Sequence, residues 1–209
     1  MINHFYPIAY LGGSGGAFLS SWLNQAMYGI PLKLNTSTGN AHDSARNAGF
    51  GIFSDQIESI EGLKQKFTDS TYKLFIGCHM VDDSLMLSNF TKVTKITYDQ
   101  DDALEIAINF YTKNPNLIDF TLEESILNRI ESTKQFNDRM SKTLPETEQS
   151  TNVSWKALLY GDPDELVDKL ANFYSIKKSN FDLANLVWWR TLAMRNIANA
   201  PVIKIGDAG

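Results

Sequence analysis

The sequence is poor in the residues that mark several classes of protein. Its 209 residues include one cysteine, Cys78, so it has no intrachain disulfide framework and suits a reducing compartment. No stretch approaches the roughly 18 consecutive apolar residues of a membrane-spanning helix. The N-terminal residues also lack the basic and apolar regions of a secretory signal peptide. We therefore expect a cytoplasmic protein without a membrane partner.

An excess of positive charge is also missing. The 19 Lys and Arg residues are outnumbered by 24 Asp and Glu residues, and the formal net charge is −5. A protein that binds nucleic acid without sequence preference needs a basic face, so we expect no nucleic-acid partner. The three histidines, His4, His42 and His79, are far apart and have no cysteines at zinc-site spacing. We therefore expect no metal site.

The most informative segment that is present runs from residue 4 to residue 28, HFYPIAYLGGSGGAFLSSWLNQAMY. An apolar run is broken by Gly12-Gly13-Ser14-Gly15-Gly16 and resumes with apolar residues spaced by three and four. This order predicts a strand, a glycine turn and a helix. Such a turn lets backbone amides approach an anion, and the helix N-terminus adds partial positive charge. Phosphate or sulfate is the first ligand to consider, and an ordinary tight turn is the alternative.

The common nucleotide-binding signatures do not fit this segment. The phosphate-loop signature requires Lys and then Ser or Thr after its last glycine, and Ala17 and Phe18 occupy those positions. The dinucleotide pattern G-x-G-x-x-G is also absent, with no acidic residue ending a second strand about 20 residues later. The sequence therefore does not favour a conventional ATP- or GTP-binding loop.

The remaining sequence alternates between strand and helix patterns. Strands are predicted at 72–78, 92–98, 152–155 and 201–205, and helices at 55–67, 82–89, 101–113, 119–140, from 162 onward and at 180–198. A capping-box pattern from Thr121 to Glu124 introduces the helix at 119–140, and Asp162-Pro163 starts the next helix with Pro in its first turn. Residues 35–52 are polar and predict a long loop. This alternation predicts one domain, residues 1–209, with a three-layer α/β/α fold and a mainly parallel sheet.

Polar residues follow three of these strands. The glycine turn follows the first strand, His79 follows the strand at 72–78, and Tyr98 and Asp99 end the strand at 92–98. In a parallel sheet the carboxyl ends of the strands share one edge, where ligands bind. We therefore expect these groups to lie on one rim. For His79 the alternative is a histidine hydrogen-bonded within the core.

Four segments, in order, resemble the cytosolic-type sulfotransferases, whose fold is related to that of the phosphate-loop nucleotide-binding proteins. Residues 11–19 (LGGSGGAFL) resemble the 5′-phosphosulfate loop, and residues 78–80 (CHM) resemble the strand end that carries the catalytic base. Residues 95–111 (KITYDQDDALEIAINFY) resemble the segment that binds the 3′-phosphate. Residues 155–166 (WKALLYGDPDEL) resemble a late segment of the family.

The resemblance implies transfer of a sulfuryl group from 3′-phosphoadenosine 5′-phosphosulfate (PAPS) to the hydroxyl or amine of a small-molecule or carbohydrate acceptor. It assigns His79 as the base, a role that suits a near-neutral pKa. It implies that the donor is bound by Gly12, Gly13, Ser14, Gly15, Gly16, Ala17 and Phe18.

This sequence departs from the family at several positions. Gly13 stands where the loop carries Lys or Arg, and Gly16 and Ala17 stand where it carries hydroxyl residues. Tyr98-Asp99 and Glu105 fall where an Arg and a Ser bind the 3′-phosphate. Acidic groups there disfavour a phosphate. Two alternatives follow: a non-catalytic or altered nucleotide- or anion-binding module on the same fold, or a small-molecule kinase.

Overall fold

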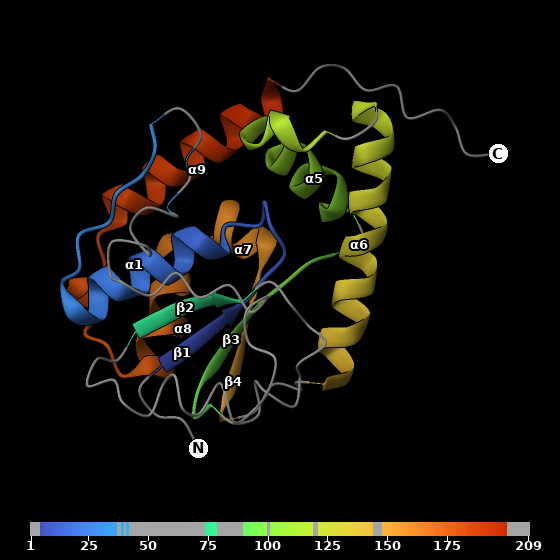
Figure 1. Cartoon of the computed structure of the whole chain (residues 1–209). Coiled ribbons are helices and arrows are strands. Elements are labelled where there is room, and N and C mark those ends of the chain that lie inside the picture. The colour runs from blue at the N-terminus through green and yellow to red at the C-terminus, as the bar shows by residue number, and fades with distance from the viewer. Residues whose placement is uncertain are drawn as a thin grey trace.

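The structure is a computed structural model of the chain. It describes residues 5–36, 39, 41, 74–78, 90–99, 101–118, 121–143 and 148–199. The described strands are β1 (Phe5–Ala9), β2 (Leu74–Cys78), β3 (Val93–Thr97) and β4 (Ser150–Ser154). The described α-helices are α1 (Gly16–Tyr28), α5 (Asp102–Lys113), α6 (Leu122–Thr143), α7 (Trp155–Leu159), α8 (Pro163–Tyr174) and α9 (Leu183–Ala198). Figure 1 shows helices around the strands, with α6 at one side of the view and α1 and α9 at the other.

The described strands form one parallel sheet in the order β2-β1-β3-β4. In this sheet Ile8 of β1 pairs with Gly77 of β2 on one side and with Thr94 of β3 on the other. The chain moves from β1 to β2 and then returns past β1 to β3, so its winding reverses between β1 and β3. Ligands of open α/β sheets bind beyond the carboxyl ends of the strands at such a reversal. The predicted α/β fold with a parallel sheet is confirmed.

Helix α1 is tied to β2 through a side chain that pairs with backbone. The Asn24 side-chain oxygen accepts a hydrogen bond from the Phe75 amide at 2.8 Å, and its Nδ2 donates to the Phe75 carbonyl at 3.0 Å. The side-chain amide of Asn24 thus pairs with the Phe75 backbone as the backbone of a neighbouring strand would. The pairing fixes the position of α1 along the sheet.

The core surrounds α1 on nearly every side. Each residue from 18 to 24 is at most 3% exposed, although a surface helix would expose about half of its residues. The Phe18 ring stacks on Trp189 of α9 with a centroid distance of 4.7 Å, and the Trp22 ring meets Phe181 edge-on at 5.0 Å. The turn between β1 and α1 therefore leads into a helix that is buried on nearly every side.

Several predicted helix starts are confirmed by their caps. Thr121 Oγ1 accepts from the Glu124 amide and Glu124 accepts from the Thr121 amide, which is the capping box expected from the sequence. Asp162 caps α8 by accepting from the amides of Asp164 and Glu165, with Pro163 at the first helical position.

Other boundaries differ from the predictions. Helix α6 starts at 122 and continues to 143, where the sequence predicted 119–140. Helix α9 starts at 183 instead of 180, because Asp182 caps it by accepting from the amides of Ala184 and Asn185. Strand β4 begins at 150 and ends where Ser154 caps α7. The helices predicted at 55–67 and 82–89 and the strand predicted at 201–205 lie outside the described residues.

Candidate functional site

The turn after β1 is closed by hydrogen bonds of its own. The Leu11 carbonyl accepts from the Ser14 amide at 3.1 Å and from the Ser14 hydroxyl at 2.6 Å. Ser14 is 0% exposed. The prediction that Ser14 offers its amide to an anion is therefore wrong, because the short turn already uses that amide.

Tyr98, the residue after β3, joins this turn. Its phenol oxygen accepts from the Leu11 amide at 2.7 Å and donates to the Ser14 hydroxyl at 2.9 Å. The prediction that the groups following β1 and β3 share one rim is confirmed. The sequence interpretation placed Tyr98 only opposite a 3′-phosphate and missed its role in the turn, although an aromatic hydroxyl at the end of a strand is a signal for such a contact.

The buried phenols make stability depend on pH. Burial raises the pKa of Tyr98 and of Tyr174 above the usual value of about 10. Above pH 10 the unfolded chain loses phenol protons that the native protein keeps, so the free energy of unfolding falls as pH rises. We expect each of the two to contribute a loss of about 1.4 kcal/mol at pH 11.

Urea unfolding at pH 8, 10 and 11 measures this loss. Burial lowers the pKa of Lys113 to about 8, so its ionisation raises stability with pH, mainly below pH 10. The loss from the phenols should therefore appear between pH 10 and pH 11. In Tyr98→Phe this decline should be shallower, because one buried phenol is gone. A free energy of unfolding that is the same at pH 10 and pH 11 would contradict the assignment.

The candidate anion-binding segment is the glycine loop, which we define as residues 12–18. Gly15 is the N-cap of α1 with φ of 83°, and no side chain caps the helix. The first helical hydrogen bond runs from the Leu19 amide to the Gly15 carbonyl at 2.9 Å. The amides of residues 16, 17 and 18 precede that bond and donate to no described residue. They are the donors that an anion requires at a helix N-terminus.

The first half of the loop is held by side chains from two helices. Arg129 Nη2 of α6 donates to the Gly12 carbonyl at 2.6 Å, and Asn109 Nδ2 of α5 donates to the Gly13 carbonyl at 2.6 Å. The guanidinium carbon of Arg129 also lies 4.0 Å from the centre of the Phe110 ring. Sequence reasoning missed both donors, because a polar residue on an amphipathic helix is usually part of its solvated face.

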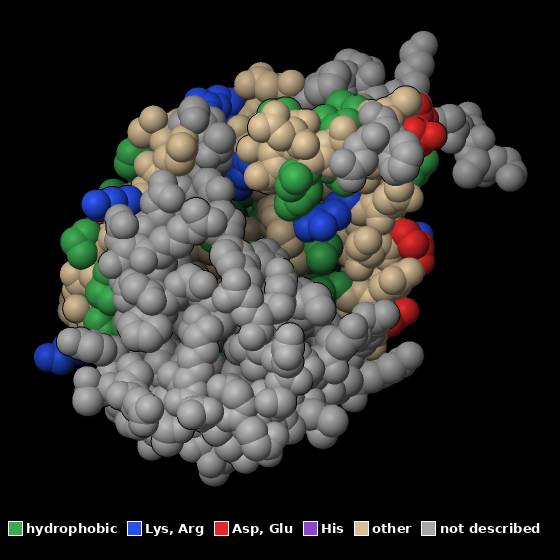
Figure 2. All heavy atoms as spheres, in the orientation of Figure 1, with side chains coloured by type: hydrophobic (Ala, Val, Ile, Leu, Met, Phe, Trp, Pro, Cys, Tyr) green, Lys and Arg blue, Asp and Glu red, His purple; other side chains and the backbone are tan. Residues whose placement is uncertain are grey.

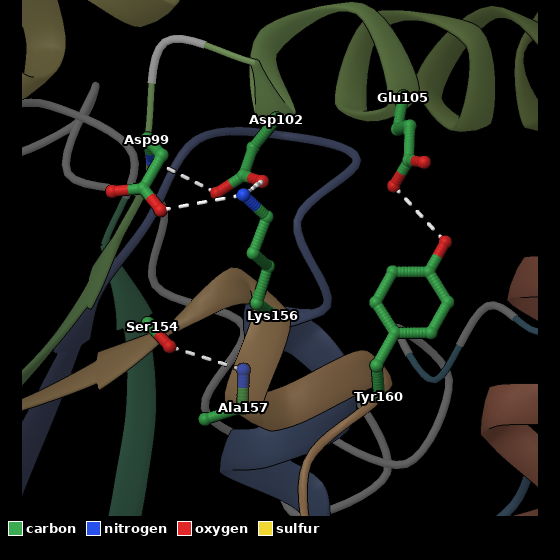
Figure 3. Close-up of polar contacts among 7 residues, drawn as sticks. All are labelled: Asp99, Asp102, Glu105, Ser154, Lys156, Ala157 and Tyr160. Carbon is green, nitrogen blue, oxygen red and sulfur yellow. Dashed lines mark hydrogen bonds and ion pairs between the residues drawn. The ribbon is translucent and has the colours of Figure 1, made fainter.

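The rim beside Tyr98 is acidic and is bridged by one lysine. Figure 3 shows Lys156 of α7 reaching toward Asp99 and Asp102, each at 3.4 Å from its amine. Asp102 is buried, and its second oxygen accepts from the Asp99 amide at 2.7 Å. The Asp102 carboxylate raises the pKa of Lys156. These contacts join the start of α5 to α7.

A second contact extends the same junction. The Tyr160 hydroxyl donates to Glu105 at 3.0 Å (Figure 3). Burial, and secondarily this carboxylate, raises the pKa of Tyr160 to about 12. Three carboxylates, those of Asp99, Asp102 and Glu105, and the amine of Lys156 thus take part in this junction.

The predicted base, His79, lies outside the described residues, as does His42. Among the described residues, the cation that contacts the loop is Arg129. Figure 2 shows basic and hydrophobic side chains together over α5 and α6, with acidic side chains along the outer edge of α6.

The described residues contain no cluster of three or more His, Cys, Asp or Glu side chains able to hold a metal ion. None of the helices in the described part of the chain combines the length and apolarity needed to span a bilayer.

Comparison with known proteins gives limited similarity. No family model matches the sequence, and no curated protein matches it. Among solved structures, the chain is similar to a sulfotransferase domain from the curacin biosynthetic pathway, with 13% sequence identity and a TM-score of 0.47. The match covers 85% of this chain and 75% of that one. At this level the similarity assigns no function or residue role to this chain.

Proposed function

We propose that the protein is a sulfotransferase-like enzyme that binds the phosphosulfate of PAPS at the glycine loop. The observation that carries the proposal is that the amides of residues 16, 17 and 18, beyond β1 at the reversal of the sheet, donate to no described residue. Three such amides at a helix N-terminus favour an anion without a metal. The resemblance of the same loop to the 5′-phosphosulfate loop specifies which anion.

The residues have separate tasks in the proposed reaction. PAPS supplies an activated sulfuryl group, whose sulfur forms a bond with the acceptor oxygen or nitrogen as the bond to the phosphate oxygen breaks. His79 takes the proton that the acceptor loses. The amides of the loop stabilise the negative charge that develops on the phosphate side.

A binding module without catalysis is the second candidate. It is favoured by Gly13, which leaves the loop itself without a cation, and by the carboxylates of Asp99, Asp102 and Glu105 at the neighbouring rim. One charge-assisted hydrogen bond contributes about 1.5–3 kcal/mol, which corresponds to roughly ten- to a hundredfold in affinity. We therefore expect PAPS to bind more weakly than micromolar.

Calorimetry with PAPS, its desulfated product and ATP, together with turnover assays, tests both candidates. Turnover of PAPS supports the enzyme, binding without turnover supports the module, and turnover of ATP would replace both with a kinase. Micromolar or tighter binding of PAPS would contradict the expected effect of the acidic rim.

The variant Asp99→Asn, tested with PAPS and with adenosine 5′-phosphosulfate, shows whether the acidic rim weakens binding through the 3′-phosphate. Asp99 is exposed, with 73% of its side chain accessible, so its replacement should not disturb the core. The variant should bind PAPS several-fold more tightly, because a like charge near the 3′-phosphate is gone. Its affinity for adenosine 5′-phosphosulfate, which has no 3′-phosphate, should be unchanged.

A further inference from the structure

We propose that Arg129 and Asn109 are positioning residues of the glycine loop, and that they direct the amide of Gly13 into the anion site. The inference rests on the proposed function, because it concerns how the same loop presents its donors. It adds Gly13, the position that lacks the loop cation, to the residues that hold the anion.

Arg129 and Asn109 hold the carbonyls of Gly12 and Gly13, and these carbonyls set the directions of the amides that follow them. In a planar trans peptide the C=O and the N–H point in opposite directions, and the described chain has no cis peptide bond. Arg129 holds the Gly12 carbonyl toward α6, so the Gly13 amide points away from α6. That amide donates to no described residue.

The next peptide shows the same relation with a visible partner. Asn109 holds the Gly13 carbonyl toward α5, and the amide of the same peptide, that of Ser14, points back into the turn and donates to the Leu11 carbonyl. The carbonyls of Gly12 and Gly13 therefore both accept hydrogen bonds from helix side chains. The Gly13 amide points to the opposite side of the loop.

Both anchors are themselves fixed. Asn109 is 0% exposed and its oxygen accepts from Asn196 of α9 at 3.3 Å. Arg129 lies over the Phe110 ring, and a Cβ at Gly12 would be 2.7 Å from its Nη2 and 2.9 Å from that ring. The close approach of Arg129 and Phe110 leaves little room for a side chain at Gly12.

The charge of Arg129 has no opposite partner in the described part of the chain. No described carboxylate forms an ion pair with it, and its buried Nε has no hydrogen-bond acceptor. A partly buried cation with no counter-ion among the described residues is costly to keep unless another group compensates its charge. A bound anion beside Gly12 would offset that cost, since charges interact more strongly where water is excluded.

The experiment titrates the protein with sodium sulfate, against sodium chloride at equal ionic strength, and follows the backbone amides by ¹⁵N–¹H NMR. In the unmodified protein the Gly13 amide should shift together with those of residues 16, 17 and 18. If residues 16 to 18 respond and Gly13 does not, the inference is overturned and the proposed function stands. If no amide of the loop responds, both are overturned.

Variants separate orientation from charge. Arg129→Met and Asn109→Ala should each weaken sulfate binding about tenfold or more and remove the response of Gly13. Asn109→Ala leaves the net charge unchanged. Weaker sulfate binding in this variant therefore could not be explained by a purely electrostatic role of Arg129. Lys134→Met, which removes an exposed charge from the same helix, should bind sulfate as the unmodified protein does.

Melting curves distinguish positioning from support of the fold. A merely structural role would lower the melting temperature and leave the sulfate affinity of the folded protein unchanged, and that outcome would overturn the inference. The response of Gly13 in the unmodified protein decides the question even if Arg129→Met does not fold.

Discussion

Replacing His79 by Ala should reduce sulfuryl transfer by about 10²–10⁴-fold, the usual effect of losing a general base. The expectation comes from the sequence, because His79 follows the strand 72–78, and from the register of the sheet. Strand β2 pairs in parallel with β1 as far as Cys78 and Ala9, so the carboxyl end of β2 lies beside the end of the strand that leads into the glycine loop. The affinity for the donor should barely change, since in the proposed function the loop amides, and not the imidazole, hold the anion.

One sample of the variant provides the decisive measurements. Turnover, PAPS affinity by calorimetry and melting temperature are compared with those of His42→Ala, a histidine that the sequence places in a solvated loop. A large fall in melting temperature with unchanged activity per folded molecule would identify His79 as a core residue and exclude the catalytic role. Equal turnover in the two variants would exclude it as well.

Replacing Gly16 by Ala should lower stability by about 3 kcal/mol, or roughly 6–12 °C in melting temperature for a chain of this size. Helix propensity alone predicts the opposite sign, because alanine is favoured over glycine within a helix by about 1 kcal/mol. The reason for the reversal is contact: a Cβ at Gly16 would overlap the ring of Tyr10, which is only 3% exposed. Neither the buried ring nor the enclosed helix α1 has room to move.

The matched substitution Gly29→Ala separates contact from backbone strain. Gly29 has φ of 68°, but a Cβ there would meet nothing within 4 Å, so the cost should be near 1 kcal/mol. In a Tyr10→Ala background the cost of Gly16→Ala should be smaller, because the ring atoms that its Cβ would overlap are gone. If Gly16→Ala is as stable as the unmodified protein, the close packing of Tyr10 on the loop is wrong.

Local features of the fold could be predicted because they depend on neighbours in the chain. Apolar residues spaced by three and four predict α1, and Thr121 with Glu124 and Asp162 with Pro163 mark helix starts that the structure confirms. The start at 183 was missed because the predicted helix, 180–198, begins before Asp182, and it is Asp182 that caps the helix.

In the site, too, features that depend on neighbours in the chain could be predicted, and those that depend on distant residues could not. The sequence by itself determined that a glycine turn joins a strand to a helix and that this strand belongs to a parallel sheet, because periodicity and turn chemistry act over a few residues. Only the tertiary structure decided that Ser14 is used within the turn and that Tyr98, Asn109 and Arg129 hold it. These side chains are separated from their partners by 84 to 117 residues. Whether each meets the turn depends on how the sheet and helices pack, which no local pattern records.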